Sequence, residues 1–322
     1  MRFLPVFRHY LWGGERLRSH LGKSFHEPTA AESWEIVDHA NAQSIVLNGE
    51  LAGRELHDLM QEYGADLVGD QCWSHVIRDD LPDNLKRRFP LLIKFLDANS
   101  DLSVQVHPND RQAAQQDVPD LGKTEAWYVV DAKSGSRIFA GLKMGVTKRD
   151  FAAAIDAGTT DSCLHSFEAQ AGGCVLVPAG TQHAIGAGCL ILEVQQASDT
   201  TYRVFDWNRV DANGNSRELH VDQAMRVTNF ERGPIHPIEP VVLDNGSLQL
   251  AQCEYFSIKK FELDECEFEL GEMDRFEIIC VIQGELKIED SSLKLGQTIL
   301  LPPGHYKTNA LENGTKFLRI VT

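Results

Sequence analysis

Alternating apolar and polar residues dominate the chain and predict short β-strands separated by turns. One such stretch runs into an Asn-Gly turn at 48–49: Ser44, Ile45, Val46 and Leu47. Successive side chains of a strand point to opposite faces, so this pattern is typical of sheets with one buried face. Stretches of this kind recur along most of the sequence and favour a mainly β protein.

Two stretches have helical spacing instead. One apolar stripe repeats every three or four residues and ends before Gly64: Leu56, Leu59, Met60 and Tyr63. A second helix is expected to begin at Thr147, because Asp150 three residues later completes a capping box, and to end at Gly158. We expect the region 52–90 to be a helical insertion on the β scaffold.

A spaced pattern of glycine, proline and histidine occurs twice. The pattern Gly-x5-Pro-x-Gly-x2-His spans 172–183 and returns with identical spacing at 296–307, where Lys307 replaces His183. A looser Glu–Gly pair precedes each copy: Glu125 with Gly135, and Glu277 with Gly284. Ordinary Gly-Pro turns between strands would also produce such a pattern. An internal repeat is the better explanation, and it predicts two β-barrel modules of which only the first carries the histidine.

Composition excludes several classes of protein. The 322 residues are 43% hydrophobic and 24% charged, which is ordinary for one large or two moderate folded domains. A formal charge of −16 argues against a generic nucleic-acid binder. There is no apolar run of 18 residues and no signal-peptide pattern, so we expect no membrane partner. Seven dispersed cysteines without a Cys-x-x-Cys pair suggest reduced thiols and a cytoplasmic protein.

Polar residues on predicted strands form a candidate metal site. In the segment 102–108, Ser103, Gln105 and His107 alternate with valines and share one face, although a barrel interior is normally apolar. Two further ligand candidates are Glu125, on a later strand, and His183, which follows a Pro-Ala-Gly turn. Each residue alone has a structural explanation, since a single histidine is more often hydrogen-bonded than metal-bound. The combination favours zinc or a neighbouring first-row metal.

The charge of the ligands determines how strongly a bound metal ion acts as a Lewis acid. One glutamate and one neutral glutamine would leave a Zn²⁺ site with a net charge near +1, so the ion stays a Lewis acid. Lys123 lies two residues before Glu125 on the same strand face, where a cation could depress its pKa and make it a proton carrier. Lys94, between Ile93 and Phe95, would be costly to bury unpaired, so a substrate phosphate is a reasonable partner.

These residues resemble the cupin superfamily, and more closely the type I mannose-6-phosphate isomerases, in a short bacterial form. The resemblance extends from residue 12 to about 210. It is carried by these segments: Trp12-Gly13-Gly14, Glu32-Ser33-Trp34-Glu35, Gln105-Val106-His107-Pro108-Asn109, Lys123-Thr124-Glu125-Ala126-Trp127-Tyr128, Pro178-Ala179-Gly180-Thr181-Gln182-His183, 193–203 and Asp206-Trp207-Asn208-Arg209. Several motifs in the same order are far more specific than any one alone.

The resemblance implies a fold of two cupin (jelly-roll β-barrel) modules with a small helical insertion in the N-terminal half. We expect a catalytic metal-binding module over 1–235, containing the helical segment 52–90, and a metal-free module over 236–322. The missing histidines of the second copy fit that division. The chain is shorter than the longer family members, from which the expected phosphate site is taken over.

The resemblance also implies the roles of individual residues. One zinc ion per chain would be bound by four ligands: Gln105, His107, Glu125 and His183. The catalytic residues implied are Arg203, Lys123, and an acid that is Glu193 or Asp199. The substrate, a sugar phosphate, would contact Ser103, Lys94 and Trp12. Trp12 and Trp34 could form the floor of a sugar site, although tryptophan is more often part of the core. Arg203 could instead form an ion pair with Asp199 or Asp206.

The expected reaction interconverts mannose 6-phosphate and fructose 6-phosphate by metal-assisted proton transfer through an enediol. Three alternatives remain at this point. The chain could isomerise another hexose 6-phosphate, act as an iron-dependent cupin oxygenase, or bind a sugar without catalysis. Oligomeric state, native metal and pathway direction are not readable from the sequence.

Overall fold

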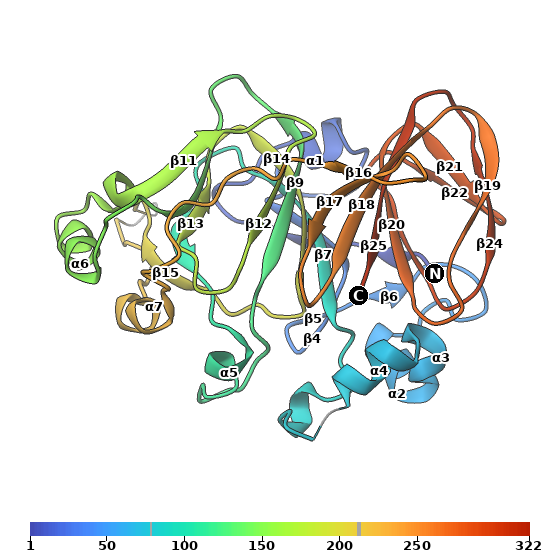
Figure 1. Cartoon of the computed structure of the whole chain (residues 1–322), viewed down its shortest axis with the longest axis horizontal. Coiled ribbons are helices and arrows are strands. Elements are labelled where there is room, and N and C mark those ends of the chain that lie inside the picture. Colours follow the sequence, from blue (N-terminus) through green and yellow to red (C-terminus); the bar gives the residue numbers. More distant parts are fainter. Residues whose placement is uncertain (78, 211–213) are drawn as a thin grey trace.

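Two pairs of β-sheets form the body of the protein in the computed structural model, which describes residues 1–77, 79–210 and 214–322 (Figure 1). The first pair begins with a five-stranded sheet in the order β11 (Leu164–Glu168), β10 (Arg137–Leu142), β13 (His183–Ile185), β8 (Val104–Val106) and β15 (Tyr202–Phe205). Its six-stranded partner has the order β12 (Cys174–Val177), β9 (Glu125–Ala132), β14 (Cys189–Gln196), β7 (Leu91–Asp97), β3 (Glu32–Ile36) and β2 (Val6–Arg8). The prediction of a mainly β protein is confirmed.

The second pair contains the C-terminal strands. Its six-stranded sheet has the order β16 (Val241–Val242), β17 (Leu248–Gln252), β18 (Ser257–Leu263), β25 (Thr315–Val321), β20 (Glu277–Gln283) and β23 (Thr298–Leu301). The four-stranded sheet has the order β19 (Cys266–Leu270), β24 (Tyr306–Ala310), β21 (Glu285–Ile288) and β22 (Ser291–Lys294). Two small sheets pair β1 (Phe3–Leu4) with β6 (Ile45–Val46), and β4 (Asp38–His39) with β5 (Ala42–Gln43). The division of the chain at 235/236 stays a prediction, although β15 and β16 fall in different pairs of sheets.

The central strands of the first six-stranded sheet are buried on both faces. On β7, Ile93 and Phe95 pack in one core cluster with Ile278 of β20, so the two six-stranded sheets face each other. Leu96 on the opposite face belongs to a separate cluster inside the first pair of sheets. Because neighbouring side chains alternate, Lys94 also faces that interior. Polar groups on this face therefore lie inside the first pair of sheets, away from the contact between the pairs.

The two copies of the repeated pattern adopt the same local structure. Each copy supplies a strand, a Pro-x-Gly turn and the next strand: β12 and β13 in the first, β23 and β24 in the second. Glu125 opens β9 and Glu277 opens β20, each beside the first strand of its copy. Glu277 forms an ion pair with Arg319, and Lys307 is exposed. The second copy thus has the strands of the first without its cluster of ligand candidates.

Both predicted helices are present. Helix α2 (Leu56–Tyr63) ends at Gly64, which has a φ of 50°. Helix α6 (Lys148–Asp156) begins after Thr147, whose side chain forms the expected capping box with Asp150. Further helices and 3₁₀ turns are α1 (Arg16–Ser19), α3 (Ala65–Val68), α4 (Asp70–Val76), η1 (Asp83–Leu85), α5 (Asp110–Ala113), η2 (Thr160–Cys163) and α7 (Val221–Val227). No helix in the described ranges is long and apolar enough to span a membrane.

The helical segment that contains α2, α3 and α4 contacts both pairs of sheets (Figure 1). Leu59 and Val68 lie in the core cluster shared with Ile93 and Phe276. The backbone amide of Phe276 also donates to the carbonyl of Val68. The segment is therefore more than an addition to the N-terminal half, because it covers one end of the contact between the two six-stranded sheets.

Candidate active site

Three of the predicted ligands meet between the sheets of the first pair. His107 follows β8, Glu125 opens β9 and His183 opens β13, so the residues come from strands of both sheets. One ligand atom from each lies within 4.8 Å of the others, and each residue is only 1% exposed. Nε2 of His107 is 3.5 Å from Oε2 of Glu125, and Nε2 of His183 is 3.2 Å from Oε1. We refer to these three residues as the His–Glu–His cluster.

Backbone carbonyls orient both imidazole rings. Nδ1 of His107 donates to the carbonyl of Thr200 and Nδ1 of His183 donates to the carbonyl of Thr181, each at 2.8 Å. A carbonyl can only accept, so the proton of each neutral ring resides on Nδ1 and the Nε2 lone pair faces Glu125. This is the arrangement in which a histidine ligates a metal while its other nitrogen is held by the protein.

The His–Glu–His cluster has the chemistry of a metal site. Among the described residues, Oε1 of Glu125 and Nε2 of His183 are buried without a hydrogen-bond partner, and Oε2 of Glu125 is 2.8 Å from the Lys123 ammonium. Burial, together with the nearby Glu193 carboxylate, raises the pKa of Glu125 to about 8. Burial and the Lys123 ammonium lower the pKa of His183 to about 3. A divalent cation would bind the free lone pairs of the two neutral imidazoles and compensate the charge of a carboxylate that burial destabilises. These residues therefore fit a bound metal ion.

Gln105 lies beside the cluster on β8. It is paired in register with His183 on one neighbouring strand and with Arg203 on the other. Directly opposite residues on neighbouring strands project to the same face, so Gln105 shares the interior face with both. Its side chain is half-buried and lines the adjacent cavity. The position suits a fourth ligand, and that role stays a prediction.

A chain of buried charges adjoins the cluster. Nζ of Lys123 is 2.8 Å from Oε2 of Glu125, 2.9 Å from Nε2 of His107 and 3.7 Å from Oε1 of Glu193. Glu193 is only 2% exposed, and its Oε2 accepts a hydrogen bond from Nε1 of Trp127 at 3.1 Å. Despite burial, which raises it, the pKa of Glu193 is lowered by the ammonium groups of Lys94 and Lys123. Glu193 is therefore held ionised.

Lys94 already has anionic partners within the protein. Its Nζ is 3.2 Å from Oε1 of Glu193 and 3.7 Å from Oε2 of Glu32. Burial alone would lower the pKa of Lys94, but the carboxylates of Glu193 and Glu32 raise it overall, so the ammonium stays charged. The anionic partners expected for a buried Lys94 are therefore present within the protein, in Glu193 and Glu32. The contact of Lys94 with substrate stays a prediction.

A polar cavity of about 260 Å³ lies next to the cluster. Its walls include most of the predicted site residues: Trp12, Lys94, Ser103, Gln105, Lys123, Glu193, Asp199 and Arg203. Tyr10, Glu32, Thr201 and Arg217 complete the polar lining and were not found from the sequence. Glu32 and Thr201 lie within motif segments that carry the resemblance but were given no role, whereas Tyr10 and Arg217 lie outside those segments and are brought to the cavity by the fold.

Arg203 is fixed at the cavity wall and, among the described residues, has no carboxylate within ion-pair distance. Its Nε donates to Oγ of Ser103 at 3.1 Å and its Nη1 donates to the carbonyl of Glu218 at 2.9 Å. Asp206, an expected partner, forms its ion pair with Arg209 at 2.6 Å instead. The guanidinium therefore remains available to an anionic or oxyanionic group in the cavity.

The two tryptophans have different environments. Trp12 is 5% exposed, stacks on Tyr10 with ring centroids 5.7 Å apart and lines the cavity. Trp34 is a core residue whose Nε1 donates to Oε2 of Glu32 at 2.6 Å. Trp34 therefore supports the Glu32 carboxylate that neutralises Lys94, rather than forming the cavity floor.

Asp120 is a site residue that the sequence did not reveal. Its Oδ2 accepts hydrogen bonds from Oγ of Ser198, the amide of Asp199 and Oγ1 of Thr200. Its Oδ1 accepts from Nη1 of Arg88 at 2.8 Å. The carboxylate thus fixes the segment that carries Asp199 and the carbonyl that orients the His107 ring. An isolated aspartate in a loop gives no sequence signal of this role, because the contacts depend on residues distant in the chain.

A buried cluster of candidate ligands next to a polar cavity, within paired antiparallel sheets, is typical of the cupin fold. The family model described as phosphomannose isomerase type I, catalytic domain, matches residues 1–134. Mannose-6-phosphate isomerase ManA of Bacillus subtilis is 37% identical over 313 residues, which cover 94% of this chain and 92% of that protein. The mannose-6-phosphate isomerase of Streptococcus mutans is 35% identical over 299 residues, covering 91% and 89%. The chain belongs to the type I phosphomannose isomerase family.

Solved structures agree with this assignment. The crystal structure of the Bacillus subtilis mannose 6-phosphate isomerase superposes with a TM-score of 0.83 at 33% identity, over 100% of this chain and 98% of that one. A mannose 6-phosphate isomerase described as bound with zinc and yttrium has a TM-score of 0.73 at 16% identity, which shows a shared fold. The resemblance inferred from the sequence motifs is confirmed.

Proposed function

We propose that the chain interconverts mannose 6-phosphate and fructose 6-phosphate, with one zinc ion held by Gln105 and the His–Glu–His cluster. The observation that carries this proposal is the convergence of three buried side chains with metal-ligand atoms, His107, Glu125 and His183, next to a charged cavity. The family membership and the names of the relatives support the substrate. Two imidazoles with oxygen ligands support zinc as the metal.

The reaction moves a proton between two adjacent carbons of the sugar by way of an enediol. When bound, the metal supplies a Lewis acid that polarises the substrate's carbonyl and hydroxyl oxygens. Lys123, Glu193 and Asp199 line the cavity and are the candidates for the group that carries the proton. Glu193 is ionised but occupied by Lys94 and Trp127, whereas among the described residues the Asp199 carboxylate has only a 3.4 Å hydrogen bond from Asn41. Of these two carboxylates, Asp199 has fewer partners within the protein and is the better placed to contact substrate.

The guanidinium groups of Arg203 and Arg217, the cationic wall of the cavity, suit the phosphate and the developing oxyanion. Arg203 is held by Ser103 and by a backbone carbonyl, so its fork is pre-organised before substrate arrives. Arg217 lines the same cavity and adds a second guanidinium. Guanidinium groups bind phosphate oxygens in a planar, bidentate manner. This arrangement favours a phosphorylated, polar substrate over the apolar ones typical of an oxygenase.

A coupled assay on purified protein tests the proposal. Mannose 6-phosphate and glucose 6-phosphate are supplied separately, and fructose 6-phosphate formation is followed before chelation, after chelation and after zinc is added back. We expect turnover of mannose 6-phosphate that the chelator abolishes and zinc restores. Turnover of glucose 6-phosphate alone, or no turnover with zinc demonstrably bound, would exclude the proposed reaction and would favour another hexose phosphate or a binding role.

A further inference from the structure

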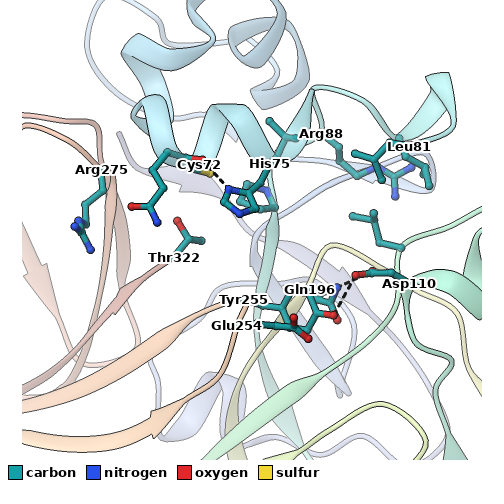
Figure 2. Close-up of a pocket in the computed structure, with 15 residues that line it drawn as sticks. Cys72, His75, Leu81, Arg88, Asp110, Gln196, Glu254, Tyr255, Arg275 and Thr322 are labelled. Atoms are coloured by element: carbon teal, nitrogen blue, oxygen red, sulfur yellow. Dashed lines mark hydrogen bonds between the residues drawn. The ribbon is translucent and has the colours of Figure 1, made fainter. Parts of the chain in front are cut away.

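The tip of one hairpin in the second pair of sheets reaches the first. Tyr255 lies between β17 and β18, and its hydroxyl donates to Oδ2 of Asp110 at 3.1 Å. Asp110 opens α5, shortly after His107. Figure 2 shows Tyr255 and Gln196 approaching the same Asp110 carboxylate. A side chain from the metal-free half of the molecule therefore contacts a segment next to the candidate active site.

The other carboxylate oxygen of Asp110, Oδ1, links the contact with Tyr255 to the segment before the strand that carries Glu125. Oδ1 accepts from the amide of Gly122 at 2.8 Å and from Nε2 of Gln196 at 2.9 Å. Oε1 of Gln196 in turn accepts from the amide of Thr124 at 2.9 Å. Both routes end on the segment 122–124, which immediately precedes Glu125. We call these four side chains the Tyr255 network: Tyr255, Asp110, Gln196 and Thr124.

Thr124 extends the network to the other ligands. Its Oγ1 accepts from the amide of Ala179, in the turn before His183, at 3.2 Å. The neighbouring amide of Lys123 donates to the carbonyl of Pro108, the residue after His107, at 3.0 Å. The segment 122–124 is thus hydrogen-bonded to the chain beside both histidines. A displacement of this segment would change the position of Glu125 relative to both rings.

A cavity lies on one side of the Tyr255–Asp110 hydrogen bond, so packing does not take the place of this bond there. A cavity of about 280 Å³ lies beside the contact, and Tyr255, Asp110 and Gln196 form part of its wall (Figure 2). Burial and the carboxylates of Asp110 and Glu254 raise the pKa of Tyr255, so its hydroxyl remains a donor. Because a cavity borders the contact, the hydroxyl–carboxylate hydrogen bond is the link by which the second pair of sheets holds the Oδ2 side of Asp110.

We propose that Tyr255 is a positioning residue through which the metal-free half holds the segment 122–124, and with it Glu125, in the geometry needed for metal binding and turnover. The inference rests on the proposed zinc-dependent reaction. It predicts that removing one hydroxyl, distant from the substrate cavity, weakens the retention of zinc as well as catalysis.

Tyr255→Phe tests this, because it removes the hydroxyl and keeps the ring. The zinc-loaded variant should release zinc to a chelator about threefold to tenfold faster than the unaltered protein, and kcat should fall by a similar factor, as expected for a residue that supports metal ligands indirectly. Tyr306→Phe is the matched control. It also removes a half-buried tyrosine hydroxyl of the second pair of sheets, which donates to the carbonyl of Pro302 at 2.9 Å outside the network. We expect unaltered zinc release and kcat for this control.

A double-variant cycle distinguishes an effect transmitted through the Tyr255 network from a general loss of stability. Asp110→Ala should accelerate zinc release more than Tyr255→Phe, and the double variant should resemble Asp110→Ala alone, because Tyr255 acts through that carboxylate. Unaltered zinc release and kcat in Tyr255→Phe, or equal effects of the two tyrosine variants, would overturn the inference. If the unaltered zinc-loaded protein fails to isomerise mannose 6-phosphate, the proposed function is refuted, while the zinc-release comparison still decides the role of Tyr255.

Discussion

At the scale of single residues, the candidate active site is a balance of buried charges. Lys94 lies between Glu32 and Glu193, and Lys123 lies between Glu193 and Glu125. Each ammonium therefore has two carboxylates within 4 Å. Removing one member of such a set leaves a buried charge unpaired, so these side chains are expected to tolerate substitution poorly.

His183 is the most direct test of the ligand set. His183→Ala removes a neutral imidazole whose Nε2 lacks any hydrogen-bond partner, so it should lose bound metal and activity together. Metal content by mass spectrometry and the coupled assay measure both. His305→Ala is a suitable control, because His305 is exposed and belongs to the second pair of sheets. A His183→Ala protein that is active and replete with metal would remove this residue from the ligand set.

Arg203 tests the cationic wall separately from the metal. Arg203→Met keeps much of the side-chain volume and does not touch the His–Glu–His cluster, so metal should stay bound. We expect kcat/KM to fall about 100-fold, as for the loss of one pre-organised donor to a developing oxyanion. Steady-state kinetics with metal analysis measure this, and Arg209→Met, outside the cavity lining, serves as the control. Unchanged kinetics would exclude Arg203 from the mechanism.

At the scale of elements, the loop before β9 and the corner after β14 hold each other in place. Asp120 on the loop accepts three hydrogen bonds from residues 198–200 and one from Arg88. Asp120 and Arg88 are both buried, so Asp120→Ala should cost about 3 kcal/mol or more in unfolding free energy. The same change should lower kcat, because the corner carries Asp199 and orients the His107 ring.

The stability contribution of Asp120 should depend on pH. Despite burial, which raises it, the pKa of Asp120 is lowered in the folded protein by His39 and Arg88 from an ordinary value of 3.8. A carboxyl with a depressed folded-state pKa stabilises the protein above its ordinary pKa and loses that effect as pH falls. The difference in unfolding free energy between unaltered protein and Asp120→Ala should therefore be constant from pH 7 to 5 and shrink toward pH 3. Urea unfolding at each pH measures it.

Asp83→Ala is the control for that series. Asp83 pairs with Lys86 at 2.9 Å, but its side chain is 96% exposed, so its removal should change stability little at any pH. The role assigned to the buried Asp120 carboxylate would be contradicted if Asp120→Ala changed the unfolding free energy little at pH 7, or if its effect on the unfolding free energy grew as pH falls.

Helix α6 offers a prediction without any consequence for catalysis. Thr147→Ala removes the hydroxyl that accepts from the amide of Asp150, so it should cost about 1 kcal/mol of stability. Thr147 does not line the substrate cavity, so kcat should be unchanged. Urea unfolding and the coupled assay test the two statements. A large loss of activity would mean that α6 affects the candidate active site.

The helices that could be predicted from the sequence are those whose signals lie within the helix or directly beside it. Helices α2 and α6 have an apolar stripe or a capping box within their own residues. Helix α7 was missed because its seven residues are stabilised mainly by contacts with distant parts of the chain. Helix α5 was missed although Asn109 and Gln112 form a capping box that could have been recognised.

Site residues likewise fall into those with a local sequence signal and those that depend on contacts between distant segments. The ligand candidates were readable because Gln105 and His107 alternate on one strand and the turn before His183 has a distinctive spacing. The partners of Lys94 were not, since Glu193 becomes its direct neighbour only through the register of β14 with β7. Asp120, Glu32 and the Tyr255 network likewise depend on contacts between segments that are far apart in the sequence.

At the scale of the whole molecule, two halves with the same strand arrangement have different interiors. The first pair of sheets encloses the His–Glu–His cluster. In the second pair, Glu277 is neutralised by Arg319 and Lys307 points to solvent. Among the described residues, the metal-type cluster of the first pair has no counterpart in the second. The second pair of sheets contacts the first through the shared core and the Tyr255 network.

The central claim is that turnover of mannose 6-phosphate requires one metal ion at this single cluster. Titrating zinc into metal-stripped protein, while following fructose 6-phosphate formation, tests it most directly. We predict activity that rises linearly and reaches its plateau at about one zinc per chain, the occupancy of one catalytic site. Full activity in the metal-stripped protein, or activity that is absent at one bound zinc per chain, would contradict the account.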